Sequence, residues 1–169
     1  MVWYVFNTAW GWAAIYGEGK NVQSSFLPFP TLEEILEHIA KTGLNARFIA
    51  DNDISQPVVN NYRAYYQGQV ISDWNVEIKL TNLPLFTQRV LQYVYTIPYG
   101  ETRTYSEAAM ALGNPRACRA VGQALKRNPL PLIIPCHRVL AVNSPGGFSA
   151  TGGINTKRKM LAWERERLE

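Results

Sequence analysis

The sequence has few cysteines, little charge and no long apolar run. Its 169 residues contain two cysteines, Cys118 and Cys136, which is too few for a disulfide framework and favours a reducing, cytoplasmic setting. Charged residues make up 18% and hydrophobic residues 47%, which excludes a disordered tail and fits a packed core. No run of about eighteen apolar residues is present, so we expect no membrane-spanning helix. Residues 1–17 carry no charge, but they lack the basic segment of a signal peptide, so no cleaved leader is expected.

The charge is distributed unevenly along the chain. Residues 1–85 hold five Lys and Arg against eight acidic residues, a net charge of −3, whereas residues 86–169 hold twelve against five, a net charge of +7. A basic half joined to an acidic half indicates a polyanionic partner on one side of the molecule, although an ordinary solvated surface explains the same counts.

The N-terminal half shows strand signals followed by helix signals. Thr31 and Glu34 form a capping-box pattern that predicts a helix to about residue 42, and helical spacing predicts a second helix over about 54–66. His38, alone in the first helix, is expected to be a surface or packing residue. The strand-like runs are 2–7, 12–16, 22–26 and 76–80. Residues 1–80 are therefore predicted to form a small α/β domain with a hairpin-rich sheet.

The C-terminal half is predicted to be mostly helical. After a helix over about 86–96, Thr104 and Glu107 form a second capping box that starts a helix over 105–112. Gly113 ends it, and Asn114-Pro115 is expected to start the next helix at once. Two helices joined by so short a turn predict a helix-turn-helix. The whole chain is thus expected to be an α+β protein, with residues 81–169 as its second domain.

The second of these helices has a basic outer face. Its inner face is apolar, and small residues separate the polar positions of the outer face, so that a backbone or a groove can approach closely. Cations on a rigid element suit binding to DNA phosphates; an αα-hairpin with a solvated face is the alternative. The outer face carries Arg116, Arg119, Gln123, Lys126 and Arg127, with Ala120 and Gly122 between them.

One cysteine is followed directly by a histidine and an arginine. Cys136-His137-Arg138 ends an extended apolar run, and a thiol in an electropositive setting becomes a nucleophile. A buried inert cysteine is the alternative. A zinc site is not expected, because it would want about four ligands and the two Cys and two His of the chain show no C-x-x-C spacing. Because neighbours on an extended segment point to opposite faces, we expect a water between Cys136 and His137. Glu164 is the candidate acid that orients the histidine, since Glu101 and Glu107 have local roles.

Residues 85–164 resemble the O6-alkylguanine-DNA alkyltransferases (methylated-DNA–protein-cysteine methyltransferases). The resemblance rests on residues 113–122, 128–129 and 134–140, in matching order and spacing. The N-terminal half matches only in outline.

The resemblance implies a single-turnover DNA repair protein. It would bind double-stranded DNA carrying O6-alkylguanine from the minor groove and flip the base out, since O6 is unreachable inside the stack. Arg119 matches the family's arginine that fills the gap left in the DNA helix by the flipped base. Tyr105 matches the tyrosine that assists extrusion of the base and hydrogen-bonds it. The resemblance also implies that the protein uses no cofactor, does not bind a membrane and is a monomer. The DNA contacts would come from Thr104, Tyr105, Arg119, Ala120, Gly122 and Lys126.

The resemblance also assigns the reaction. Cys136 would accept the alkyl group permanently, with His137 as its base and Glu164 orienting that base. Asn128 matches a hinge asparagine, and Arg138 would tie loops together. The substrate would contact Tyr105, Cys136, Val139, Thr151 and Gly152.

The loop over residues 141–153 departs from the family pattern. It has extra residues before Gly152-Gly153, so whether Ser149 or Thr151 lies near the guanine oxygen stays open. Some family members hold zinc in the N-terminal domain, but no cysteine precedes Cys118 here, so no metal is expected. Cys118 itself is interpreted as a small filler, with a second modifiable thiol as the alternative.

Three other functions compete with alkyl transfer. A helix-turn-helix regulator explains the basic half but not residues 135–138. A non-enzymatic protein that recognises alkylated guanine would lack the cysteine, which is present here. A cysteine hydrolase would need an oxyanion hole and repeated turnover.

Overall fold

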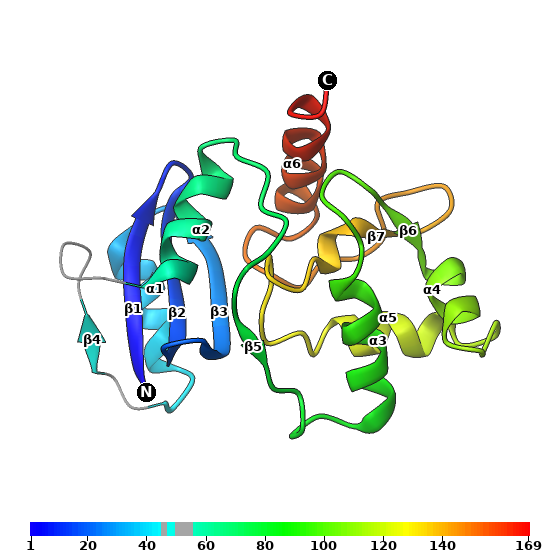
Figure 1. Cartoon of the computed structure of the whole chain (residues 1–169), viewed down its shortest axis with the longest axis horizontal. Helices are drawn as coiled ribbons and strands as arrows, with labels where there is room; N and C mark the ends of the chain where they lie inside the picture. The colour runs from blue at the N-terminus through cyan, green and yellow to red at the C-terminus, as the bar shows by residue number, and fades with distance from the viewer. Residues whose placement is uncertain (45–46, 50–55) are drawn as a thin grey trace. The chain divides into compact units, whose positions relative to one another are not determined.

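The computed structural model describes residues 1–44, 47–49 and 56–169. It divides into two compact units, Met1–Lys79 and Leu80–Glu169 (Figure 1). None of the helices in these described ranges has the length and apolar character needed to cross a membrane.

The first unit is built on a five-stranded sheet. Its centre is an antiparallel meander of β1 (Val2–Thr8), β2 (Gly11–Glu18) and β3 (Asn21–Phe29). Two short parallel strands, β4 (Phe48–Ile49) and β5 (Glu77–Ile78), complete the order β4-β1-β2-β3-β5. The hairpin-rich sheet predicted from the sequence is therefore present.

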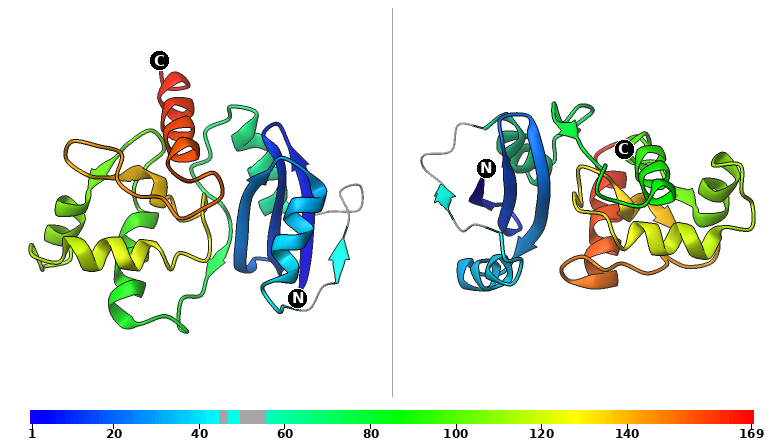
Figure 2. Two further views of the ribbon diagram at one scale, coloured as in Figure 1. Left: turned by 180° about the vertical axis from the view of Figure 1, so that it is seen from behind. Right: turned by 90° about the horizontal axis from the view of Figure 1, so that it is seen from below.

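Two helices cover the two faces of this sheet. α1 (Leu32–Ala40) packs Ile35 and Ile39 against Trp3 and Val5 of β1, and α2 (Pro57–Tyr66) packs on the other face (Figures 1 and 2). There the ring of Tyr62 meets that of Phe6 edge-on, with centroids 5.7 Å apart. Alternate residues of a strand point to opposite faces, so burial on both sides explains why Trp3 to Phe6 are all buried.

Several details of the first unit differ from the predictions. The strand predicted over 76–80 is only the two-residue β5, and residues 54–55 of the predicted second helix lie outside the described ranges. At α1, Glu34 N donates to Thr31 Oγ1 (3.2 Å), but that hydroxyl donates in turn to Glu34 Oε1 (3.1 Å). The predicted capping box is thus half formed, because the carboxylate bonds the hydroxyl.

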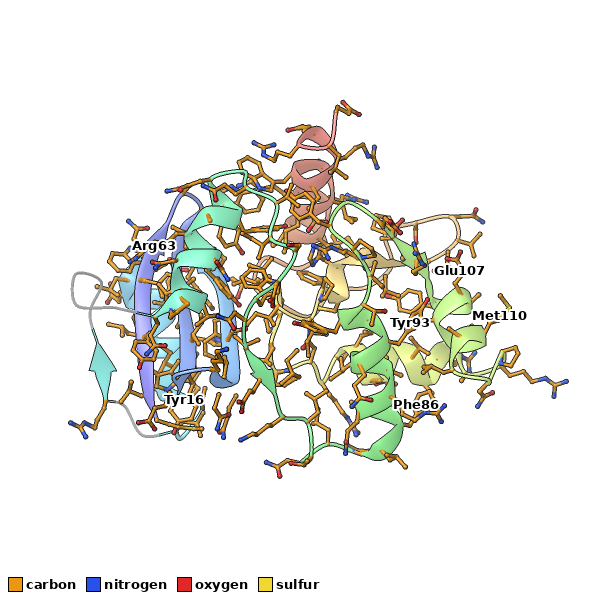
Figure 3. All side chains as sticks on the ribbon, viewed as in Figure 1. Tyr16, Arg63, Phe86, Tyr93, Glu107 and Met110 are labelled. Carbon is orange, nitrogen blue, oxygen red and sulfur yellow. The ribbon has the colours of Figure 1, made fainter. Side chains whose placement is uncertain are left out.

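Two polar side chains of the first unit, His38 and Arg63, pack on its aromatic rings. Exposed His38 meets the ring of Phe26 edge-on, with centroids 4.7 Å apart, which agrees with a packing role. The guanidinium of Arg63, labelled in Figure 3, lies 5.6 Å from the centre of the Phe6 ring.

The second unit is mostly helical. Its only described sheet is a parallel pair, β6 (Arg103–Thr104) and β7 (Val139–Leu140). The helices α3, α4 and α5 pack against one another. The helical elements are α3 (Leu85–Tyr95), α4 (Tyr105–Ala111), α5 (Cys118–Leu125), the 3₁₀ turn η2 (Cys136–Arg138) and α6 (Gly153–Glu166).

The start of α4 agrees with the sequence pattern in full. Glu107 N donates to Thr104 Oγ1 (3.1 Å), and Thr104 N donates to Glu107 Oε2 (2.6 Å), which is a reciprocal capping box. The helix then presents Glu107 and Met110 on its outer side, where Met110 is exposed (Figure 3).

The start of α5 was predicted wrongly. Asn114 does not cap it: Ala117 N donates to the Asn114 carbonyl (3.0 Å), and the helix begins only at Cys118. The four residues 114–117 instead form a turn with Pro115 in its second position, where the fixed φ of proline is favoured. α4 and α5 are therefore joined by a longer connection, residues 112–117, than the three-residue turn expected.

Candidate active site

A cavity of about 530 Å³ lies in the second unit, and Cys136 forms part of its wall. The residue is 9% exposed, so its thiol is largely buried. The cavity takes its walls from α4, α5, η2 and the loop before α6. The lining residues are Tyr105, Arg119, Gly122, Gln123, Leu125, Lys126, Cys136, Gly147, Phe148 and Ser149.

The backbone at Cys136 is a tight turn rather than the predicted extended segment. Arg138 N donates to the Pro135 carbonyl (2.9 Å), and Val139 N donates to the Cys136 carbonyl. These bonds close a 3₁₀ turn, so the argument that Cys136 and His137 must face opposite sides does not apply. The sequence did not predict this turn, because a run of prolines and apolar residues is compatible with extended backbone as well as with a 3₁₀ turn.

Asn128 holds the segment that leads into the turn. Its Nδ2 donates to the Ile134 carbonyl (2.9 Å), and its Oδ1 accepts from Leu130 N (3.0 Å). One side chain thereby bridges the two ends of residues 130–134.

The two residues that follow Cys136, His137 and Arg138, form a buried cluster with Glu164. His137 Nε2 lies 2.6 Å from Glu164 Oε1, while Arg138 donates to both carboxylate oxygens (2.9 and 3.0 Å) and to the Ile97 carbonyl (2.7 Å). Gly100 N adds a bond to Glu164 Oε2 (3.0 Å). α6 supplies Glu164 and η2 supplies its two partners, so the carboxylate is fixed from several directions and Arg138 ties segments together.

The environment sets the charge of each group in the cluster. Burial alone would raise the pKa of Glu164, but His137 and Arg138 together hold that pKa well below its usual range. Burial lowers the pKa of His137 despite the opposing pull of Glu164. Near neutral pH the pair is thus a carboxylate and a neutral imidazole. With Nε2 donating to Glu164, the lone pair is on Nδ1, which has no partner among the described residues.

The Cys136 thiol is protonated at rest. Burial raises its pKa, while a hydrogen bond from the Asn128 side chain and the charge of Lys157 oppose that effect. Loss of the thiol proton therefore needs a base close by.

Lys157 is a part of the site that sequence reasoning missed. Its buried Nζ donates to the carbonyls of Val139 (2.6 Å) and Gly147 (3.1 Å), and burial lowers its pKa to about 8. It also lies 5.9 Å from the centre of the Tyr105 ring. The signal was present: Lys157, Met160 and Glu164 follow at helical spacing and are the buried residues of α6.

Tyr105 forms one side of the cavity from the first turn of α4. Burial raises the pKa of its phenol, which is therefore a neutral hydrogen-bond donor near pH 7. Gly146 packs so closely on the ring that a Cβ atom added there would lie 2.8 Å from the phenol oxygen. Glycine at position 146 therefore allows the loop to approach the Tyr105 ring this closely.

The structure brings together only some of the predicted contact residues. Tyr105, Arg119, Gly122, Lys126 and Cys136 line the cavity. Ala120 is exposed on α5 without lining it, and Thr104 caps α4.

On the substrate side, the Val139 carbonyl already accepts from Lys157. Thr151 and Gly152 are absent from the lining, because a turn closed by Gly153 N and the Ala150 carbonyl (3.0 Å) directs them into the start of α6. Gly147, Phe148 and Ser149 line the cavity instead, so of Ser149 and Thr151 only Ser149 is part of its wall.

The rest of the site offers cations but no metal cluster. Within residues 1–44, 47–49 and 56–169, no group of three or more His, Cys, Asp or Glu could hold a metal ion. Cys118 is half-buried between α4 and α5, with Sγ 3.6 Å from Ser106 Oγ, consistent with a small filler. The outer face of α5 exposes Arg119, Gln123 and Lys126 beside Arg116 and Arg127.

Comparison with known proteins gives consistent results. A family model described as the DNA-binding domain of 6-O-methylguanine DNA methyltransferase matches residues 85–166. The chain is 36% identical over 138 residues to a probable methylated-DNA–protein-cysteine methyltransferase of Acanthamoeba polyphaga mimivirus, covering 80% of this chain and 91% of that protein. It is 55% identical over 86 residues to the corresponding Methanocaldococcus jannaschii protein, over 51% of this chain and 48% of that one.

Solved structures resemble both units. The Mycobacterium tuberculosis OGT crystallised with DNA superposes with a TM-score of 0.77 at 30% identity, covering 99% of this chain and 94% of that one. A second crystal structure, of the O6-methylguanine-DNA methyltransferase from Pyrococcus kodakaraensis, gives a TM-score of 0.70 at 25% identity, covering 96% and 98%.

Proposed function

Because the chain belongs to the methylated-DNA–protein-cysteine methyltransferase family, we propose that it repairs DNA by taking the alkyl group of O6-alkylguanine onto Cys136. One observation carries the proposal: Cys136 lines a cavity, and the next residue in the chain, His137, forms a buried pair with Glu164. A cavity of about 530 Å³ falls in the range of small-molecule sites, which supports its use as a pocket for one base.

DNA is the partner that this site requires. α4 and α5 act as a helix-turn-helix, and the exposed cations of α5 contact phosphates from the minor groove. The damaged base must leave the helix, since a thiol cannot reach O6 inside the stack. Arg119 and Tyr105 support this step, because both line the cavity that would receive the base. The relative from M. tuberculosis was crystallised with DNA.

The chemistry is one displacement at the alkyl carbon. A water bridges the Cys136 thiol and the free Nδ1 of His137, which takes the proton, while Glu164 stabilises the imidazolium. The S–C bond forms as the C–O6 bond breaks, and the electron pair of the broken bond stays with the purine. The guanine anion then takes up one proton from water, and the imidazolium of His137 releases its proton to water, so the charges balance. The Tyr105 phenol hydrogen-bonds the departing purine.

The reaction happens once per molecule. A thioether is a poor leaving group, and among the described residues lining the cavity Cys136 is the one thiol, so nothing there displaces the alkyl group again. The reaction uses no cofactor.

A titration against methylated DNA tests the proposal. A duplex carrying O6-methylguanine is mixed with increasing protein, restored guanines are counted, and the protein is digested for mass spectrometry. We expect one guanine restored per molecule, with the methyl group on Cys136. Repeated turnover, or a methyl group on another residue, would overturn the proposed mechanism.

Two variants separate DNA binding from transfer. Cys136→Ser should abolish transfer and leave DNA affinity nearly unchanged, because the phosphate contacts come from α5. Arg119→Ala should lower the transfer rate more than the affinity for undamaged DNA, with Arg127→Ala, an exposed neighbour outside the cavity, as its control. Equal losses in both measurements for both variants would argue against a role of Arg119 in flipping.

A further inference from the structure

A second cavity, of about 410 Å³, lies in the same unit between α6 and the residues that follow β7. It shares no lining residue with the cavity of Cys136, and the proposed reaction makes no use of it. Its wall is largely apolar: Leu140, Val142 and Pro145 come from β7 and the loop, and Leu161 comes from α6. Val142 is 74% exposed, an unusual position for a valine that has nothing to contact.

Two arginines flank this apolar wall. Arg158 and Arg165 of α6 both line the cavity and are exposed. They are seven residues apart, which on a helix places them on one face about 10 Å from each other. Apolar Leu161 and Ala162 lie between them on that face.

The charge of these arginines is not neutralised within the described part of the chain. Neither side chain forms an ion pair there, because the acids of α6 are engaged elsewhere: Glu164 with His137 and Arg138, and Glu166 with Arg167. The cavity therefore combines an exposed apolar surface with two unpaired cations, which favours a ligand that is both apolar and anionic.

We propose that this cavity binds an acidic peptide segment of a partner protein, with one large apolar side chain in the cavity and carboxylates on Arg158 and Arg165. The two arginines are anchored about 10 Å apart along α6, a spacing over which a peptide presents one carboxylate to each of them. A DNA backbone would satisfy the arginines but would leave the apolar wall without a partner. A peptide satisfies both features, in the manner of other acidic-motif recognition by arginines.

Fluorescence anisotropy with the full chain tests this proposal. The probe is a labelled synthetic peptide in which aspartates flank a single phenylalanine. We expect saturable binding that weakens about tenfold for Arg158→Ala or Arg165→Ala, the loss of roughly one charge-assisted contact. Val142→Asp should weaken binding at least as much, because it places a like charge at the exposed edge of the wall. Lys41→Ala, which removes an exposed cation of the first unit, is the matched control and should bind as the parent does.

Three outcomes would overturn the proposal. Absence of saturable binding would show that the cavity takes no such peptide. Equal binding of a peptide with serine in place of phenylalanine would show that charge alone acts. Displacement of the peptide by undamaged duplex DNA, together with loss of binding in Lys126→Ala, would place the peptide on α5 instead. None of these results bears on alkyl transfer, which the titration described above measures separately.

Discussion

The ammonium group of Lys157 joins the two ends of the segment that follows the reactive turn. It donates to the Val139 carbonyl at 2.6 Å and to the Gly147 carbonyl at 3.1 Å. A buried cation in such a position is costly unless its hydrogen bonds are made. The loop that lines the cavity is therefore held in place by the hydrogen bonds of one side chain.

The stability of the protein should depend on pH through Lys157. Burial lowers its pKa to about 8 from an ordinary 10.5. Below pH 8 the folded and unfolded states both hold the proton, whereas between about 8 and 10.5 only the unfolded state does, so the free energy of unfolding rises with pH. Lys157→Met lacks this titration. Urea unfolding of both proteins measures this effect. As the pH rises from about 8 to 10.5, the unfolding free energy of the parent should increase relative to that of Lys157→Met, by up to about 3 kcal/mol. A difference independent of pH would contradict the lowered pKa.

Gly146→Ala should impair alkyl transfer by displacing Tyr105. The new methyl group would lie 2.8 Å from the phenol oxygen, and φ at this position is +75°, so we expect a loss of about 1 kcal/mol in stability. The transfer rate should fall at least about tenfold, because a displacement of about 1 Å at a site is enough for such losses. Single-turnover rates measure this.

Gly19→Ala is the control for that variant, since φ there is also positive (+57°), a Cβ atom meets nothing within 4 Å, and the residue does not line the cavity. Its transfer rate should stay close to that of the parent. Similar losses in both variants would point to the general cost of alanine at a positive φ, and not to Tyr105, as the cause.

Glu164→Gln should destabilise the fold and slow transfer together. The amide keeps the shape of the carboxylate but leaves the Arg138 guanidinium buried without its counter-charge, which costs about 3–5 kcal/mol. His137 also loses the group that raises its pKa, so it becomes a weaker base. Urea unfolding and single-turnover rates measure the two effects.

Glu166→Gln controls for the loss of one negative charge on α6. Its carboxylate is exposed and pairs only with Arg167, so stability should change by about 0.5 kcal/mol or less. A Glu164→Gln protein as stable as this control would show that the buried cluster does not need the charge.

Asn128→Ala should raise the pKa of the Cys136 thiol. It removes the side-chain hydrogen bond that lowers this pKa, and it leaves Leu130 N without its partner, at about 1–3 kcal/mol for a buried group left unpaired. The Ile134 carbonyl still accepts from Cys136 N. The rate of alkylation by iodoacetamide, measured as a function of pH, reports the pKa of the Cys136 thiol. Asn155, an exposed residue of α6, is the control. If the pH dependence of alkylation in Asn128→Ala equalled that in Asn155→Ala and in the parent, Asn128 would have no effect on the pKa of the thiol.

Local patterns predicted the elements whose contacts are local. The capping box of Thr104 and Glu107 specifies its own geometry within one turn of helix, and it formed as expected. The pattern Asn114-Pro115 suits either a helix start or a β-turn, and only packing of α5 against α3 and α4 decides between them. The same ambiguity affected residues 135–138, which read as extended and form a 3₁₀ turn.

Long-range relations in the site were less accessible. Glu164 was a candidate because the histidine needs an acid, yet its bonds to Gly100 and Arg138 join segments that are distant in sequence. Lys157 escaped notice because a lysine on a terminal helix usually faces solvent. The placement of Ser149 in the cavity, in place of Thr151, depends on the turn before α6, which one inserted residue is enough to shift.

The hydrogen bonds that close the turn at Cys136 have a consequence for the spent protein. The amide of Cys136 is bonded to the Ile134 carbonyl and its carbonyl to Val139 N, so the sulfur cannot retreat to make room for what it has acquired. The alkyl group kept on Cys136 must therefore occupy part of the cavity that an incoming base would otherwise fill. A used molecule is therefore expected to be a poorer host for a second lesion, and the more so the bulkier the group it carries.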